Sequence, residues 1–109
     1  MLYITIEDFY AQAESAVHLT REQERACAAA MAAGDTDARR RLIQSYLPYV
    51  ASAIRRAPAD IRTLHTVYAA IAALEKAVDT FRFQQEGETF AHHLSWRLRQ
   101  CLTRCIAER

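Results

Sequence analysis

Glycine and proline are scarce in this chain of 109 residues, which contains only 2 of each. This scarcity excludes a glycine-rich loop that could hold a phosphate, and it excludes the tight turn around a nucleophilic serine. The chain is instead rich in alanine, with 21 residues, and alanine is the strongest helix former. The composition therefore predicts an all-α protein, and this length is typical of a single domain.

Lysine is almost absent, because Lys76 is the only one among the 14 basic residues and the other 13 are arginines. Arginine is preferred where a planar group binds phosphate, carboxylate or a base edge through two hydrogen bonds. Residues 1–38 contain seven acidic and two basic side chains, whereas residues 39–109 contain six acidic and twelve basic ones. The charge distribution thus favours an anionic partner for the later part of the chain. A GC-rich genome, which favours arginine and alanine codons together, is an equally good explanation of the arginine count.

Long apolar runs and a basic, apolar leader are also missing, so the sequence predicts neither a membrane span nor a signal peptide. The three cysteines (Cys27, Cys101 and Cys105) lack the paired spacing of a metal site. We therefore expect reduced thiols in a cytoplasmic protein, with no metal and no cofactor. No combination of serine, histidine and acid has the spacing of a catalytic site, and we predict that the protein is not an enzyme.

Apolar residues recur at helical spacing and predict a bundle of about five helices. The expected ranges are about 5–17, 20–33, 36–57, 64–81 and 90–107. Pro48 lies inside the third range and predicts a kink near residues 44–48, because proline clashes with the preceding turn. The polar residues 84–89 are expected to form a loop. Aromatic residues in the first helix (Tyr3, Phe9 and Tyr10) raise the alternative that a homodimer covers them.

The last predicted helix has two different faces. At about 100° per residue, one arc is apolar and is expected to face the core. Its members are Leu94, Leu98, Cys101, Leu102, Cys105 and Ile106. The opposite side carries Trp96, Gln100 and Thr103, flanked by cations and histidines. The flanking residues are His92, His93, Arg97 and Arg104.

This outer face has the residue types of a nucleic-acid surface. Exposed aromatic rings stack on unpaired bases, glutamine pairs with an adenine edge, and arginine neutralises phosphates. The alternative is structural: Trp96, the only tryptophan, packs beneath residues 82–89 or against the first helix.

Three blocks of the sequence resemble a known family in order along the chain. The first runs from Leu19 to Ile43, with an Ala-Gly-Asp turn at residues 33–35; the second is Ala77–Phe81; the third is Phe90–Ile106. The third block is the most specific, because Trp96, Arg99, Gln100, Thr103 and Arg104 stand in register with the family pattern. Residues 19–109 thus resemble region 2 of bacterial sigma factors of the sigma-70 family, with residues 1–18 as an additional N-terminal helix.

The resemblance implies a helical domain that takes part in transcription initiation. In that family, region 2 binds core RNA polymerase and captures bases of the promoter −10 element from the single-stranded non-template strand. Trp96 would then stack at the edge of the melted DNA, while Gln100 and Thr103 would read the upstream end of the element. Arg99 and Arg104 would support the site and contact the DNA backbone.

Two aromatic positions of the family pattern hold His93 and Arg97 in this chain, and both are included in the expected DNA-binding surface. The polymerase-binding segment of the family corresponds to residues 65–71, whose polar groups differ from the family pattern. The expected polymerase contacts are the apolar residues of this helix. They are Val67, Tyr68, Ile71 and Leu74.

Two alternatives remain open from the sequence. In the first, the chain is a DNA-binding regulator of a mobile element that does not bind polymerase. In the second, it is a protein-interaction module in which Trp96 anchors a partner, since tryptophan and arginine are common at interface hot spots.

Overall fold

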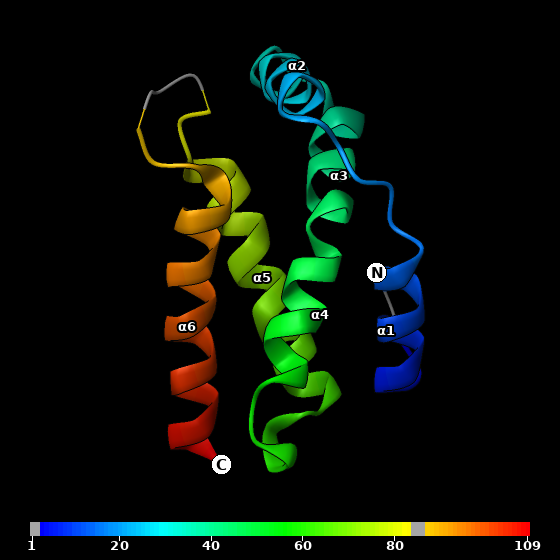
Figure 1. Cartoon of the computed structure of the whole chain (residues 1–109), viewed down its shortest axis with the longest axis vertical. Coiled ribbons are helices and arrows are strands. Elements are labelled where there is room, and N and C mark those ends of the chain that lie inside the picture. The colour runs from blue at the N-terminus through cyan, green and yellow to red at the C-terminus, as the bar shows by residue number, and fades with distance from the viewer. Residues whose placement is uncertain (1–2, 84–86) are drawn as a thin grey trace.

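The computed structural model describes residues 3–83 and 87–109, which form six α-helices and one short 3-10 helix (Figure 1). The elements are α1 (Ile6–Glu14), α2 (Arg21–Ala32), α3 (Thr36–Ser45), α4 (Leu47–Arg55), η1 (Ala59–Ile61), α5 (Leu64–Thr80) and α6 (Phe90–Glu108). The described residues contain no strand, and the prediction of an all-α bundle is confirmed. Of the expected loop at residues 84–89, residues 84–86 lie outside the described part of the chain.

Short polar side chains start the helices where the sequence predicts. The hydroxyl of Thr5 accepts a hydrogen bond from the backbone of Asp8, whose carboxylate accepts one from the Thr5 backbone in return. Thr20 and Gln23 form the same reciprocal pair at the start of α2. Each pair satisfies two backbone N–H groups that lack partners within the helix.

The predicted kink at Pro48 is a break between two helices. Tyr46 has φ −102° and ψ 1°, so it ends α3 and begins α4. Pro48 is therefore the second residue of a new helix and not an interior residue of a long one. A proline in the first turn removes no helical hydrogen bond, which explains why this position accepts it.

Helices α5 and α6 run antiparallel beside each other, and α4 lies between α5 and α1 (Figure 1). The long stripe of α5 is buried against α3, α4 and α6, with Val67, Leu74 and Ala77 fully enclosed. Leu94 and Leu98 of α6 complete this core. An ion pair between Arg39 and Asp79, with 2.7 Å between Nε and Oδ1, joins α3 to α5 at the surface and lowers the pKa of the Asp79 carboxyl.

Helix α1 belongs to the same core as the rest of the chain. Its Phe9 is fully buried, and the Tyr3 ring packs edge-on against it with 5.4 Å between ring centroids. Arg55 of α4 lies over the Tyr10 ring and pairs with Glu14 at 2.9 Å. These contacts cover the aromatic residues that suggested a dimer, so their presence no longer calls for a second copy of the chain.

The first helix ends at Glu14, three residues earlier than expected, and residues 16–20 connect it to α2 without helical structure. Among the described residues, no helix combines the length and the apolar content needed to cross a membrane.

Candidate nucleic-acid interface

Helix α6 presents the two faces that its periodicity predicts. Leu94, Leu98 and Cys105 are buried, and the remaining members of the apolar arc are half-buried. On the opposite side, Trp96 is 52% exposed, so the alternative in which it packs under neighbouring segments is not what the structure shows. An indole with half of its surface in water retains an open ring face, which can stack on a flat partner.

The polar residues beside Trp96 are exposed and unengaged. Arg99, Gln100, Thr103 and Arg104 are all at the surface. Within the described part of the chain, none of their side chains forms a hydrogen bond or an ion pair. A ligand can therefore bind these side chains without first breaking a hydrogen bond or an ion pair within the protein.

A groove runs along one side of this face, between α4 and α6. Its floor includes Leu98 and Leu102 of α6, and its walls carry Arg99 and Arg56. The hydroxyls of Tyr49 and Ser95 lie 2.9 Å apart and bridge the two helices at one end of the groove.

A second groove lies on the other side, between α5 and α6. It is lined by the alanines of the exposed side of α5, with the cations Lys76, Arg97 and Arg104 around them. Gln100 also lines this groove, whereas Thr103 lines the first one. The outer face of α6, with Trp96, Gln100 and Thr103, therefore forms a ridge between the two grooves. Each groove has at least two basic side chains in its lining.

His93 and Arg97 form a clasp between α6 and the end of α5. The Arg97 guanidinium donates through Nε to Nε2 of His93 at 3.0 Å and through Nη2 to the Thr80 hydroxyl at 3.3 Å. The His93 ring also packs against Phe81, with 5.2 Å between centroids. Both residues were expected to contact DNA, but these contacts hold them half-buried at the edge of the interface.

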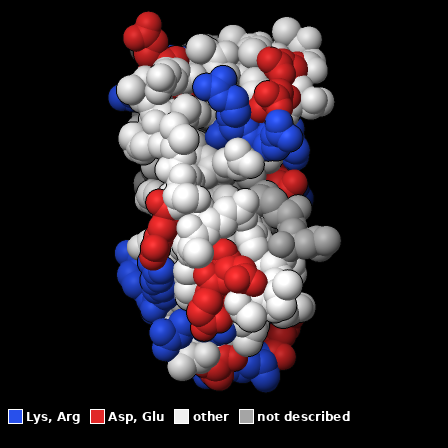
Figure 2. Space-filling model, turned by 90° about the vertical axis from the view of Figure 1, so that its right-hand side faces the viewer, with Lys and Arg blue, Asp and Glu red and all other residues white. Residues whose placement is uncertain are grey.

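The charged residues of α6 itself are almost all basic, since Glu108 in its last turn is the only acidic residue of that helix. Helix α1, on the opposite side of the bundle, carries three acidic residues and no basic one, although the face in Figure 2 presents both acidic and basic side chains (Figures 1 and 2). An anion that approaches α6 therefore meets mainly basic side chains.

The expected polymerase contacts are corrected by the structure. Val67, Ile71 and Leu74 are buried in the core, where a partner protein has no access to them. Tyr68 is 38% exposed, but its hydroxyl accepts a hydrogen bond from the Tyr3 backbone at 2.8 Å. These residues hold the bundle together, and the solvent-facing side of α5 is formed by others, including His65, Ala72 and Lys76.

The cysteines are packing residues in this fold. Burial, with Cys105 close by, raises the pKa of the Cys101 thiol to about 11, so this thiol is protonated at neutral pH. Within the described ranges, no three histidine, cysteine or acidic side chains are placed to share a metal ion.

No protein-family model matches this chain. The candidate interface consists of one exposed tryptophan, two uncharged polar side chains and arginines without a partner among the described residues, all on the outer face of α6.

Three residues of this surface were not predicted from the sequence. Arg56 and Lys76 reach the grooves from α4 and α5, and Thr80 anchors Arg97 from the end of α5. No periodicity within α6 could have identified them, because their position depends on how three helices pack. For Lys76, the only indication in the sequence was that it lies on the polar, exposed side of its helix.

The titration of His93, which accepts a hydrogen bond from Arg97, is expected to make the free energy of unfolding depend on pH. Burial and the Arg97 charge lower the pKa of His93 below its ordinary value of 6.5, although Glu88 opposes this shift. The unfolded chain then binds a proton at a higher pH than the folded one. The stability that neutral His93 contributes is complete above about pH 6.5 and is lost as the pH falls through the folded-state pKa.

We expect His93→Gln to lose less stability than the wild type between pH 7 and pH 5, because the glutamine carbonyl can accept from Arg97 but does not titrate. Urea unfolding at a series of pH values measures this difference. His18→Gln, an exposed replacement before α2, should keep the wild-type profile. Parallel profiles for His93→Gln and the wild type would contradict the assignment.

Proposed function

We propose that the protein is a sigma factor-like DNA-binding protein that acts in transcription initiation, and that the outer face of α6 captures unpaired bases of the promoter −10 element. One observation carries this proposal: Trp96 is exposed on the same ridge as Gln100 and Thr103, with the free guanidinium groups of Arg99 and Arg104 beside it. The similarity of residues 90–106 to sigma region 2 supports the same reading of the same face.

The chemistry of this ridge favours single-stranded over duplex DNA. An aromatic side chain stacks only on a base that has left its own stack, whereas arginines contact the phosphates of either form. Gln100 can pair with an adenine edge, and the Thr103 hydroxyl can donate or accept beside it. The ridge therefore supplies stacking, base contacts and charge from one rigid helix.

The decisive experiment uses Trp96 as its own reporter, since the chain has no other tryptophan. Indole fluorescence is recorded while a single-stranded oligonucleotide with a −10 sequence, its scrambled version or the matching duplex is added. We expect quenching that is strongest for the single strand and weakens steeply as salt rises. Equal binding of single strand and duplex without quenching would exclude base capture.

A second candidate is a DNA-binding regulator that does not engage polymerase. The observation that favours it is the burial of Val67, Ile71 and Leu74, which removes three of the four expected polymerase contacts. Retention of purified core RNA polymerase by the tagged protein, beside a known sigma region 2 as positive control, separates the two candidates. Specific retention supports an initiation factor that uses other side chains of α5. Failure of retention, together with intact DNA binding, supports the regulator.

A further inference from the structure

The groove between α4 and α6 has apolar side chains at its surface that DNA capture by the ridge does not use. Tyr49 is 38% exposed, and Ala53, Ala57, Leu102 and Ile106 are half-buried along the groove. On each of the two segments these residues follow one another at intervals of four, so each segment turns one apolar stripe towards the groove. The groove therefore has two partly exposed apolar walls that face the same space, with a volume of about 510 Å³.

The length of the groove matches a short helix. Helices α4 and α6 run in the same direction along it, from the hydrogen-bonded pair of Tyr49 and Ser95 at one end to Ala57 and Ile106 at the other (Figure 1). At 1.5 Å per residue, the α6 wall is about 16 Å long, which is about three helical turns. In helix-in-groove recognition, apolar residues at i, i+3, i+4 and i+7 of a partner helix enter an apolar groove of this kind.

The charges of the groove are positive and come from both walls. Arg56 lies at the end of α4 and Arg99 lies on α6, and neither side chain forms a hydrogen bond or an ion pair with any described residue. The neighbouring Arg55, by contrast, points to α1 and pairs with Glu14 at 2.9 Å. None of the described residues that line the groove is acidic. Carboxylates on both flanks of a bound helix would therefore meet a guanidinium group on each wall.

A protein helix fits this groove better than a nucleic-acid strand does. Phosphates can pair with Arg56 and Arg99, but they leave the aliphatic side chains of Leu102 and Ile106 uncovered. Bases stack on flat aromatic rings, and Tyr49 is the one aromatic residue in the described lining. An amphipathic helix covers the aliphatic stripes with its apolar side and supplies anionic groups beside them.

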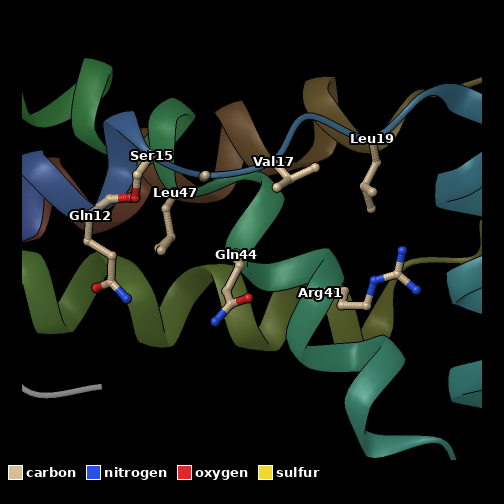
Figure 3. Close-up of a pocket in the computed structure, with 8 residues that line it drawn as sticks. Gln12, Ser15, Val17, Leu19, Arg41, Gln44 and Leu47 are labelled. Atoms are coloured by element: carbon tan, nitrogen blue, oxygen red, sulfur yellow. The ribbon is translucent and has the colours of Figure 1, made fainter.

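The depression on the α1 side of the molecule does not combine these features. Leu19 and Leu47, which border it, are buried in the core, and the Arg41 side chain lies apart from the amides of Gln12 and Gln44 (Figure 3). In the groove between α4 and α6, half-exposed aliphatic side chains and two cations line the same channel.

We propose that the groove between α4 and α6 binds an acidic amphipathic helix of a partner protein. The apolar side of that helix covers Leu102 and Ile106, and its carboxylates pair with Arg56 and Arg99. This docking does not depend on DNA binding. One consequence does rest on the proposed function: Arg99 and Thr103 belong to both surfaces, so the bound helix is expected to exclude DNA from the ridge.

The test uses a labelled, end-capped peptide of about 15 residues, the length at which an alanine-rich helix forms in water. Leucines at i, i+3, i+4 and i+7 are flanked by glutamates, with alanine elsewhere. One control peptide has glutamine in place of glutamate, and another has the same composition in scrambled order. Fluorescence anisotropy measures the affinity, and amide shifts in NMR spectra locate the site. We expect saturable binding that is at least about fivefold weaker for either control, with shifts in residues 49–57 and 95–106.

Arg56→Glu and Ile106→Glu should each weaken binding of the glutamate peptide by at least about fivefold, because each places a negative charge in the groove. Arg40→Glu on α3 changes the net charge as Arg56→Glu does and should bind within about twofold of the wild type. Thermal melts followed by circular dichroism confirm that the variants fold.

Three results would each overturn the proposal: wild-type affinity in Arg56→Glu, equal binding of either control peptide, or shifts confined to α5 and its side of α6. A fourth result also would. If Arg56→Glu binds single-stranded DNA more weakly but keeps wild-type affinity for the peptide, the groove belongs to nucleic acid. Because the peptide titration contains no DNA, its outcome is independent of the outcome for the proposed function.

Discussion

Replacing Trp96 with alanine is expected to weaken the binding of single-stranded DNA by about 5- to 150-fold, because base–aromatic stacking contributes about 1–3 kcal/mol. The change should leave the fold intact, since the ring is half exposed and the buried arc of α6 is untouched. Anisotropy of a labelled oligonucleotide measures the affinity, because the variant has lost its own fluorophore.

The salt dependence of DNA affinity distinguishes phosphate contacts from base stacking. Trp96→Ala removes no phosphate contact and should keep the wild-type slope of affinity against salt. Arg99→Ala should reduce that slope by about one unit, whereas Arg40→Ala on α3 should not change it. Trp96→Phe retains a ring and should recover part of the lost affinity. If Trp96→Ala binds as the wild type does, the ridge is not a stacking surface.

The faces of α6 were predictable because helical geometry is local. Once residues 90–107 are assigned to a helix, the angular positions of Leu94, Leu98 and Trp96 follow from a fixed rotation per residue. The exposure of Trp96 and the burial of the two leucines agree with that rotation. The helix starts at Thr5 and Thr20 were predictable for the same reason, since the capping pairs span only three residues.

For the expected polymerase contacts, the resemblance and the helical periodicity led to different predictions: exposed partner contacts and buried core residues. Val67, Ile71 and Leu74 belong to the apolar stripe that predicts the core face of their helix, and the structure buries them there. The resemblance pointed to this helix, but the three residues taken from it lie on the side of the helix that faces the core. Periodicity was the better guide here, because it reports which side of a helix is removed from water.

The clasp between α6 and α5 could not be predicted from the sequence. Arg97 and Thr80 are separated by 17 residues, and the guanidinium reaches the hydroxyl only because α5 and α6 pack antiparallel with this particular register. The break at Tyr46 is a similar case. Pro48 indicates a disturbance, but whether a helix bends or restarts depends on the packing of α3 and α4 against α5.

Replacing Phe9 with alanine is expected to lower the free energy of unfolding by about 3–5 kcal/mol, a large part of the total for a domain of this size. Phe9 is fully buried and contacts the rings of Tyr3 and Tyr10, so its removal leaves a cavity between α1 and the α4–α5 layer. Urea unfolding, followed by circular dichroism and by Trp96 fluorescence, measures the loss.

The two probes together decide whether residues 1–18 form a separate unit, as the division of the sequence suggested. Circular dichroism reports on all helices, whereas Trp96 reports on α6, at the opposite side of the bundle from α1 (Figure 1). Because Phe9 shares one continuous core with Leu74 and Leu94, both signals should shift to lower urea by the same amount. Glu7→Ala, an exposed change in α1, should leave both midpoints near the wild type. A shift in the helical signal alone, with the Trp96 transition unchanged, would mean that α1 unfolds by itself and that the core of residues 19–109 stands without it.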